Sequence, residues 1–298
     1  MQIETLKVFC DVVETGSFSA AAALNLITQS AVSQQLRALE SRFQCKLLER
    51  GRGRTRPTPA GEVLYRNSRA ILETYRNLEV ELQELREVVA GTVRIAIVYS
   101  VGLHEFPPYL REFMRAYPRV QVHVEYSRAN RIYEAVLSGT TDLGIVAYPP
   151  RHPQIVTLRF REDQLVLVAP PDHPLATAPR ADVRQLDGEP FVHYERDIPT
   201  RRAIDQLFKA HGVRPRQVAE YDNIETIKRA VEIGQGLAMV PLPAVQRETE
   251  IGTLRVVVLD GVQLVRPLGI IYKRGRQLSP AARRFVEVLR QEKAEAAA

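Results

Sequence analysis

The chain has 298 residues, of which 45% are apolar and 26% charged, a composition typical of globular proteins. Its 41 Lys and Arg residues against 35 Asp and Glu residues give a net charge of +6. At about 150 residues per domain, we expect two domains. The sequence contains no uncharged apolar run of about 18 residues, which excludes a transmembrane helix. Its two cysteines cannot form a disulfide framework, and it begins without a secretion signal, so we expect a cytoplasmic protein.

The first 58 residues predict helices joined by a short turn. Ser17 or Ser19 caps a short alanine-rich helix over residues 20–24, and Thr28 is a suitable N-cap for a further helix that extends to about residue 43. Two helices in this arrangement are typical of a helix-turn-helix, whose second helix enters the major groove of DNA. The core face of this second helix is expected to consist of Val32, Leu36, Leu39 and Phe43.

The opposite face of this helix is small and polar, and an arginine-rich loop follows it. Hydroxyl and amide side chains can hydrogen-bond base edges, while alternating glycine and arginine suits contact with phosphates. An ordinary solvated surface is the alternative interpretation of both features. The residues expected to contact DNA are Thr28, Gln29, Ser30, Ser33, Gln34 and Arg37 on the helix, and Arg50, Arg52, Arg54 and Arg56 in the loop.

Residues 59–90 predict one long helix that pairs two copies of the chain. Pro59 fits its first turn, and Gly91 fits its end. Charges at the outer positions leave a narrow apolar stripe, which favours a coiled coil over a helix packed on its own domain. The expected seam has heptad spacing with a weak point at Ser68 and comprises Leu64, Ile71, Tyr75, Leu78, Leu82, Leu85 and Val89.

Strand and helix patterns alternate after Gly91. Strands at residues 92–99, 121–126 and 143–147 enclose helices at 103–117 and 130–138, which predicts right-handed crossovers and a parallel sheet. A second α/β unit is expected next, and the chain then returns to the first. The corresponding elements are strands at 165–169, 237–240 and 268–272, with helices at 199–211, 224–233 and 279–291.

Four motifs occur in fixed order and spacing near the N-terminus, at residues 17–22, 29–40, 47–50 and 58–61. They resemble the motifs of the LysR-type transcriptional regulators, and residues 91–95, 139–145 and 234–241 extend the resemblance more loosely. Ile27 and Ser30 depart from the residues commonest in that family, which leaves the DNA sequence that is recognised open.

The resemblance implies an α/β protein of three parts: a winged helix-turn-helix (residues 1–58), a linker helix (59–90) and an effector-binding domain (91–298). That domain would contain two Rossmann-like subdomains resembling periplasmic binding proteins, residues 92–162 with 266–298, and residues 163–265. The implied partners are double-stranded DNA, a small polar or anionic effector and further copies of the chain, as a dimer and then a tetramer. RNA polymerase is a possible further partner, and no membrane is expected.

The cleft between two such subdomains is the default ligand site. Ser100 follows the first predicted strand of this domain and precedes its first helix, where its hydroxyl and neighbouring N–H groups can hold an anion, although a plain helix cap is the alternative. The resemblance makes Thr200 the opposing hydroxyl. Arg201 and Arg202 can neutralise an acidic group, although a surface ion pair is the alternative. The expected effector site comprises Ser100, Val101, Gly102, Asn130, Tyr148, Tyr194, Thr200 and Arg201.

Two other functions are weighed against a regulator. The first 90 residues argue against a plain solute-binding protein. Ser100, His104 and Glu105 invite comparison with a catalytic triad, but no nucleophile-elbow motif surrounds Ser100. Phosphate-binding and dinucleotide-binding glycine motifs and metal-ligand spacings are also missing from the sequence. We therefore predict a regulator that is not an enzyme and needs no cofactor or metal.

Overall fold

The structure is a computed structural model that describes residues 2–50, 55–84, 89–177 and 180–291. The chain divides into two compact units, Met1–Arg86 and Glu87–Ala298, which are described separately. None of the described helices is long and apolar enough to cross a membrane.

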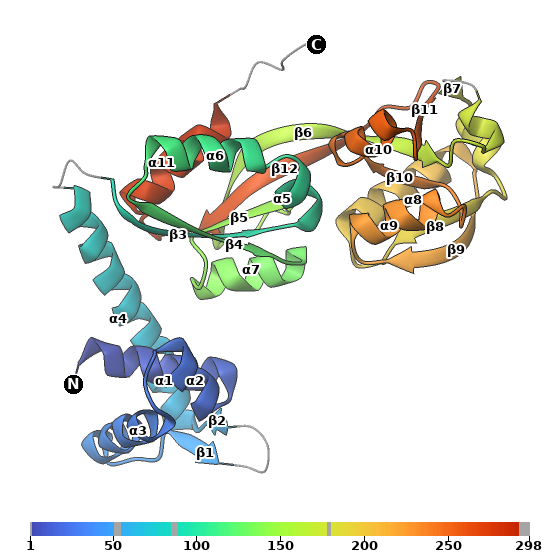
Figure 1. The fold of residues 1–298 in the computed structure, drawn as a ribbon. Coiled ribbons are helices and arrows are strands. Elements are labelled where there is room, and N and C mark those ends of the chain that lie inside the picture. Colours follow the sequence, from blue (N-terminus) through green and yellow to red (C-terminus); the bar gives the residue numbers. More distant parts are fainter. Residues whose placement is uncertain (1, 51–54, 85–88, 178–179, 292–298) are drawn as a thin grey trace. The chain divides into compact units, whose positions relative to one another are not determined.

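The N-terminal unit contains a helix-turn-helix, a two-stranded wing and a long helix (Figure 1). Gly16 ends the first helix in the left-handed conformation, with φ at 66°. Ser17 and Thr28 each accept a hydrogen bond from a first-turn N–H group of the helix that follows, as predicted. The elements are α1 (Ile3–Thr15), α2 (Phe18–Leu24), α3 (Gln29–Phe43), β1 (Leu48–Arg50), β2 (Thr55–Pro57) and α4 (Pro59–Glu84).

The first turn of α4 packs closely on the chain before the wing. Thr58 Oγ1 accepts a hydrogen bond from the Gly61 N–H at 3.0 Å and donates one to the Lys46 carbonyl at 2.7 Å. A Cβ atom on Gly61 would lie 2.0 Å from the Leu47 carbonyl oxygen. Only glycine fits at this close approach, which gives a packing reason for the motif at residues 58–61.

The long helix is shorter than predicted. Its described part extends to Glu84, residues 85–88 lie outside the described ones, and residues 89 and 90 are not helical. Val89 packs against the core of the second unit instead of continuing a helical seam. Gly91 has φ at 109° and begins a strand, so the prediction that it ends the helix is wrong. Thr92 and Val93 are β-branched and favour the extended conformation there.

The second unit begins with the predicted parallel strands, in the order β4-β3-β5. Helices α6 and α11 lie together over one face of this sheet, and the rings of Phe113 and Phe285 are 4.3 Å apart between them. Helix α7 covers the other face (Figure 1). We call this part lobe I. Its elements are β3 (Gly91–Ile97), α5 (Tyr99–His104), α6 (Pro107–Ala116), β4 (Val120–Tyr126), α7 (Ala129–Ser138), β5 (Leu143–Ala147) and α11 (Pro280–Arg290).

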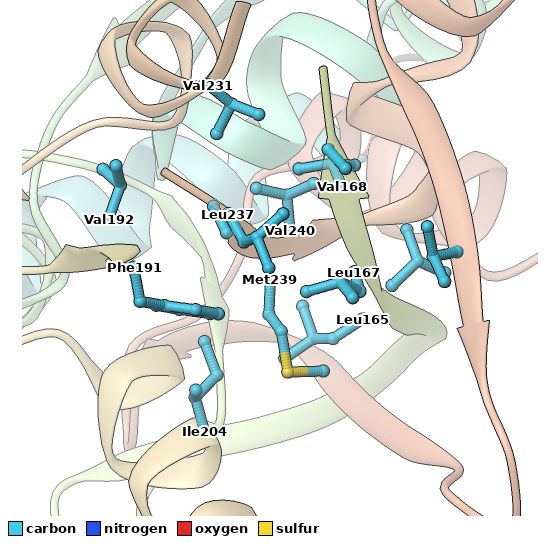
Figure 2. Packing of buried hydrophobic residues seen from close by; sticks show 14 of the residues in the cluster. Leu165, Leu167, Val168, Phe191, Val192, Ile204, Val231, Leu237, Met239 and Val240 are labelled. Carbon is cyan, nitrogen blue, oxygen red and sulfur yellow. The ribbon is translucent and has the colours of Figure 1, made fainter. Parts of the chain in front are cut away.

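A separate hydrophobic core, which defines lobe II, lies between Leu165 and Leu259 (Figure 2). The ring of Phe191 meets that of Phe208 edge-on at 5.2 Å, while Met239 lies opposite Leu167 in the strand ladder. The elements of lobe II are η1 (Pro174–Ala176), β7 (Arg180–Ala181), η2 (Val183–Leu186), β8 (Pro190–Tyr194), α8 (Pro199–His211), β9 (Arg216–Tyr221), α9 (Ile224–Glu232), β10 (Ala238–Pro241), η3 (Leu242–Ala244), α10 (Gln246–Ile251) and β11 (Arg255–Leu259).

Two long antiparallel strands, β6 (Ile155–Ala169) and β12 (Leu264–Lys273), connect the lobes (Figure 1). β12 pairs with β5 in lobe I, while the end of β6 pairs with β10 and β11 in lobe II. The sheet is therefore mixed: the three strands predicted to be parallel are parallel, and β12 pairs antiparallel with β5 and β6. The predicted boundaries after residues 162 and 265 fall between the two cores.

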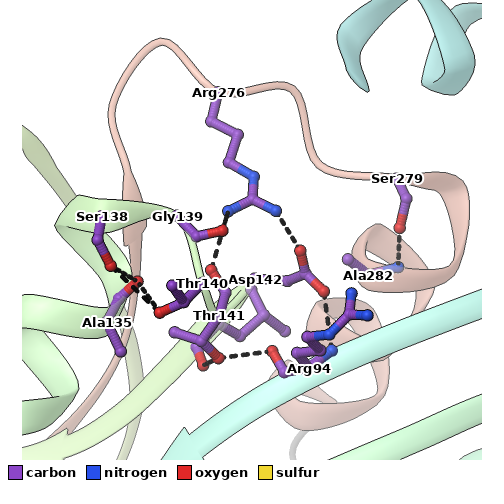
Figure 3. A network of polar contacts seen from close by, with 11 residues as sticks. Arg94, Ala135, Ser138, Gly139, Thr140, Thr141, Asp142, Arg276, Ser279 and Ala282 are labelled. Carbon is purple, nitrogen blue, oxygen red and sulfur yellow. Dashed lines mark hydrogen bonds and ion pairs between the residues drawn. The ribbon is translucent and has the colours of Figure 1, made fainter. Parts of the chain in front are cut away.

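A polar network fixes the loop between α7 and β5 in lobe I (Figure 3). Arg276 donates hydrogen bonds to the carbonyls of Gly139 and Thr141 and pairs with the Asp142 carboxylate. The same carboxylate accepts a hydrogen bond from the Arg94 N–H at 2.8 Å. The motif at residues 139–145 therefore joins the start of β5 to β3 and to the segment after β12.

Candidate functional site

Helix α3 presents the predicted polar face. Val32, Leu36 and Leu39 are buried, whereas Phe43, in the last turn, is 43% exposed and does not belong to the core as predicted. The side chains of the polar face are exposed, with Ser33 half-buried. Thr28 and Ser30 hydroxyls lie 2.9 Å apart at the N-terminal end of the helix. The exposed set on this face is Thr28, Gln29, Ser30, Gln34 and Arg37.

Two short strands, the described part of a β-hairpin, flank the predicted basic loop. β1 and β2 pair antiparallel, with Arg50 opposite Thr55 and Glu49 opposite Arg56. The Thr55 N–H donates to the Gly16 carbonyl at 3.0 Å, which ties the hairpin to the turn after α1. Arg56 is exposed. Arg52 and Arg54 lie outside the described residues.

Helix α4 carries an exposed apolar stripe. Ile71, Tyr75, Leu78 and Leu82 are each 41–54% exposed and follow one another at spacings of four, three and four residues. Leu64, predicted as part of the seam, packs instead with the core of its own unit because α1 crosses the first turns of α4. Ser68 is buried, and Leu85 lies outside the described residues.

A cavity of about 280 Å³ lies between lobe I and lobe II. It lies where strands end: Val98 follows β3, Ser127 follows β4, and Ala147 and Tyr194 are the last residues of β5 and β8. This is the predicted place, beyond the carboxyl ends of the strands. The remaining lining residues are Tyr99, Ser100, Arg128, Ala129, Asn130, Asp197, Ile198, Pro199, Thr200, Arg202, Asp222, Asn223, Ile224 and Arg266.

The inner end of the cavity is built around Arg266 of β12, which is 2% exposed. Its Nε donates to Asp163 at 2.8 Å, its Nη2 pairs with the same carboxylate, and its Nη1 donates to Ser100 Oγ at 2.9 Å. Burial alone would lower the pKa of Arg266, but the hydrogen bonds and charge of Asp163 raise it. The guanidinium therefore stays charged and fixes the Ser100 hydroxyl.

Tyr194 and Thr200 complete the inner end. Both side chains are buried, at 6% and 3% exposure. Within the described part of the chain, the Tyr194 hydroxyl has no hydrogen-bond partner, and burial raises its pKa. Thr200 lies in the first turn of α8, whose N-cap residue Ile198 provides no side-chain acceptor. An unsatisfied hydroxyl and an uncapped helix start leave donors available for a ligand.

The mouth of the cavity carries charged residues. Arg128 lies 2.8 Å from Glu195 and 2.7 Å from Asp222, and its side chain is 39% exposed. Arg202 is exposed, and no ion pair or hydrogen bond joins its guanidinium to another described residue. Since Asp163 balances Arg266, Arg202 supplies the positive charge that the cavity leaves unpaired.

Two residues expected beside Ser100 do not line the cavity. Val101 is fully buried in the core of lobe I. The N–H groups of Val101 and Gly102 both donate to the Val98 carbonyl, at 3.1 and 3.0 Å, so neither is free for an anion. Gly102 instead allows the ring of Tyr126 to approach, since a Cβ there would lie 2.5 Å from it.

Tyr148 and Arg201 also lie elsewhere. The Tyr148 hydroxyl donates to the Val265 carbonyl at 3.4 Å, and its ring packs on the core of lobe I. Arg201 is buried and binds Asp205 at 2.8 Å and the Tyr194 carbonyl at 2.9 Å. Thr200 and Arg202 line the cavity, whereas these contacts hold the Arg201 guanidinium away from it.

The sequence does not single out two of the arginines that line the cavity, Arg128 and Arg266. Arg128 is the N-cap residue of α7, two positions before the predicted Asn130. Arg202 follows Arg201, and the sequence does not tell which of the two points inward. Arg266 precedes the predicted strand, and its burial beside Asp163 depends on a pairing across 103 residues.

Among the described residues, no group of three or more His, Cys, Asp or Glu side chains is arranged to hold a metal ion. Burial raises the pKa of the Cys10 thiol to about 12. A thiol with that pKa is a weak nucleophile.

Comparison with known proteins agrees with both halves of the architecture. Residues 3–62 match the bacterial regulatory helix-turn-helix protein of the lysR family, and residues 86–294 match the LysR substrate binding domain. The chain is 32% identical over 296 residues to the RuBisCO operon transcriptional regulator of Allochromatium vinosum, which covers 99% of this chain and 97% of that protein.

Two solved structures extend the comparison. Full-length OxyR from Pseudomonas aeruginosa has the same fold, with a TM-score of 0.76 and 21% identity over 97% of this chain and 93% of that one. The regulatory domain of CcmR from Synechocystis PCC6803, in complex with 2-PG, has a TM-score of 0.64 and 27% identity, covering 69% of this chain and 99% of that one. With its N-terminal helix-turn-helix and its substrate-binding domain, this chain belongs to the LysR family of transcriptional regulators.

Proposed function

We propose that this regulator senses a small acidic metabolite in the cavity between its lobes. The observation that carries the proposal is the inner end of the cavity, which Thr200 and Tyr194 line beside Arg266, and where the Tyr194 hydroxyl has no partner among the described residues. The unpaired guanidinium of Arg202 supports an acidic group on the ligand. The complex of the related CcmR domain with 2-PG supports the same class of effector.

The size and lining of the cavity support a compact ligand. A volume of about 280 Å³ is at the lower limit of small-molecule pockets, which argues against a nucleotide. Apolar groups of Val98, Ile198 and Ile224 form much of the wall. The negative charges of Asp197 and Asp222 at the mouth would repel a highly charged anion. We therefore expect a short acid with one or two negative charges.

The ligand panel for a test comprises 2-PG, inorganic phosphate and short carboxylic acids. Thermal unfolding of the full chain should shift upward with the effector, because a ligand bound only to the folded state stabilises it. Thr200→Val and Arg202→Gln should each weaken binding several-fold in calorimetry. Lys209→Gln is the matched control, since Lys209 lies on the same helix and lines a different hollow. Equal affinity in all four proteins would refute the proposed site.

We propose that α3 reads bases in the major groove and that the wing contacts phosphates. The exposed amides and hydroxyls of α3 support the first role, and exposed Arg56 supports the second. The residues proposed for these contacts remain those predicted from the sequence. A regulator of transcription works where DNA is, so we infer a cytoplasmic location. Because the chain is similar to transcriptional regulators, we also infer that it has no enzymatic activity.

We propose that the stripe on α4 pairs two chains. Ile71, Tyr75, Leu78 and Leu82 follow the spacing of a coiled-coil seam, and their exposure supports a partner helix. A dimer of dimers and contact with RNA polymerase extend this proposal by family resemblance. The effector would then act by shifting the population between assemblies that hold the paired DNA-binding units differently.

A further inference from the structure

We propose that Arg128 is a clamp that holds the two lobes together at the mouth of the cavity and controls how long a ligand stays there. This inference rests on the proposed function for its biological role, because it assigns a gate to the same cavity. Its structural content, a specific interlobe contact, stands on separate observations.

Arg128 belongs to lobe I, between the end of β4 and the start of α7. Its charged partners all belong to lobe II. Nη1 lies 2.8 Å from Glu195 and 3.8 Å from Asp197, and Nη2 lies 2.7 Å from Asp222. One guanidinium therefore joins carboxylates that follow two different strands, β8 and β9. The hydrogen bonds that Arg128 donates to Asp222 and Glu195 raise its pKa, so the clamp keeps its charge.

The exposure of the lining residues distinguishes the inner end of the cavity from its mouth. Thr200, Tyr194 and Arg266 are buried, whereas the side chains of Arg128 and Asp222 are 39% and 45% exposed. All of them line one cavity. The clamp is therefore at the solvent side, and a ligand held by the buried residues would lie behind it.

The clamp consists of exposed ion pairs, so its closure is reversible. Exposed ion pairs are individually weak and are screened by salt, but several charges that share one geometry act as a network. Without Arg128, lobe I loses its attraction to the carboxylates of Glu195, Asp197 and Asp222 in lobe II. Loss of the arginine should thus weaken the closed form and open the mouth.

The test measures the distance between the lobes without any ligand. Spin labels are attached to Met114→Cys in lobe I and Gln206→Cys in lobe II, both at exposed positions, in a full-length chain that also carries Cys45→Ser. The raised pKa of the buried Cys10 thiol protects it from labelling. An excess of unlabelled chain keeps two labelled copies from meeting in one assembly.

In the parent protein we expect one dominant short distance at low salt. Arg128→Gln and, independently, Asp222→Asn should raise the ratio of open to closed forms by about threefold or more, as should high salt. Arg131→Gln is the matched control, because Arg131 pairs only with Glu134 of its own helix among the described residues. It should leave the distance distribution unchanged.

Parent-like distances in both the Arg128→Gln and Asp222→Asn proteins would overturn the clamp, as would an equal response to Arg131→Gln. The two variants remove opposite charges from different lobes, so misfolding of one leaves the other as a test. If the distances respond but no acid of the ligand panel binds, the clamp stands and the proposed effector fails. If an acid binds but the distances do not respond, the effector stands and the clamp is refuted.

Discussion

At the scale of the residue, Arg266 links the cavity to the strands that join the lobes. It is buried with Asp163 and contacts Ser100, so one side chain connects β12, β6 and α5. Glu105 lies nearby, with Oε1 3.6 Å from Arg266. Burial and the neighbouring Asp163 carboxylate raise the pKa of Glu105, which limits the negative charge at this point.

Arg266→Met should strongly destabilise the second unit. The change leaves the Asp163 carboxylate buried without its partner, which typically costs about 3–5 kcal/mol of unfolding free energy. Urea unfolding followed by circular dichroism measures the loss. The double variant Arg266→Met with Asp163→Leu should recover much of it, since well-packed apolar pairs replace buried ion pairs at little cost. An Arg266→Met protein as stable as the parent would contradict this view of the pair.

His193 predicts a pH dependence of stability. Burial, with a further contribution from Arg201, lowers the pKa of His193 from 6.5 to about 4. The unfolded chain therefore binds a proton below pH 6.5 that the folded chain accepts only near pH 4. Stability should fall as the pH falls through this window, by up to about 3 kcal/mol.

The measurement for His193 is the difference in unfolding free energy between pH 7 and pH 5. His193→Phe should reduce this difference, because a phenyl ring between Phe191 and Phe208 does not titrate. His211→Gln is the control, since His211 is exposed on the same lobe. An unchanged pH dependence in His193→Phe would mean that this histidine does not titrate as inferred.

Among the helices and strands, α3 offers variants that distinguish base reading from general DNA affinity. Ser33→Ala with Gln34→Ala removes polar groups from the helix face without touching its buried residues. Each lost base contact is expected to cost about 1–3 kcal/mol on specific DNA. Fluorescence anisotropy should therefore show a larger loss on the upstream region of the regulator's own gene than on random DNA. Equal losses on both would argue against a base-reading role.

The stripe on α4 makes a prediction about assembly. Leu78→Asp with Leu82→Asp would bury two carboxylates in a paired seam, at a cost of several kcal/mol, so the helices should separate. Sedimentation should detect a smaller species with unchanged folding of the second unit. Ala70→Asp adds a carboxylate at an exposed position of α4 outside the stripe and should have no effect. Retention of the parent assembly in the double variant would speak against the seam.

Local patterns predicted some elements to the residue and missed others. The limits of α8 and β5 agree with the sequence expectation, because Pro199 and Gly212 bound the first and the second is a continuous buried run. The predicted helix over residues 103–117 is two helices, since Pro107 starts a new one at α6. The sequence predicted only the last third of β6. Polar and apolar side chains are interspersed along residues 157–163, so the continuous apolar run that indicates a buried strand is confined to its end.

The sequence predicted where the candidate site lies, but not which side chains point into it. Four of the predicted residues line the cavity: Ser100, Asn130, Tyr194 and Thr200. They could be predicted because the ends of strands and the starts of helices leave local patterns in a sequence. Whether they bind an effector stays a prediction. Arg201 and Arg202 differ only by one helical step, and the long-range pairing of Arg266 with Asp163 has no local signal.

At the scale of the whole molecule, sensing and reading belong to separate compact units. Residues 1–86 contain the DNA-binding elements, and residues 87–298 contain the cavity. Changes in the cavity should therefore leave DNA affinity without effector unchanged, while changes in α3 should leave effector binding unchanged. The link between the units is the proposed shift between two assemblies, which needs a ligand with different affinity for each.

The most direct test of this account is DNA binding by the full chain with and without the acid that the ligand panel identifies. Fluorescence anisotropy on the upstream DNA would compare the parent protein with Thr200→Val. We predict equal DNA affinity of the two proteins without ligand, and a several-fold higher acid concentration for the response of Thr200→Val. An identical response of both proteins to the acid would contradict the claim that this cavity is the sensor.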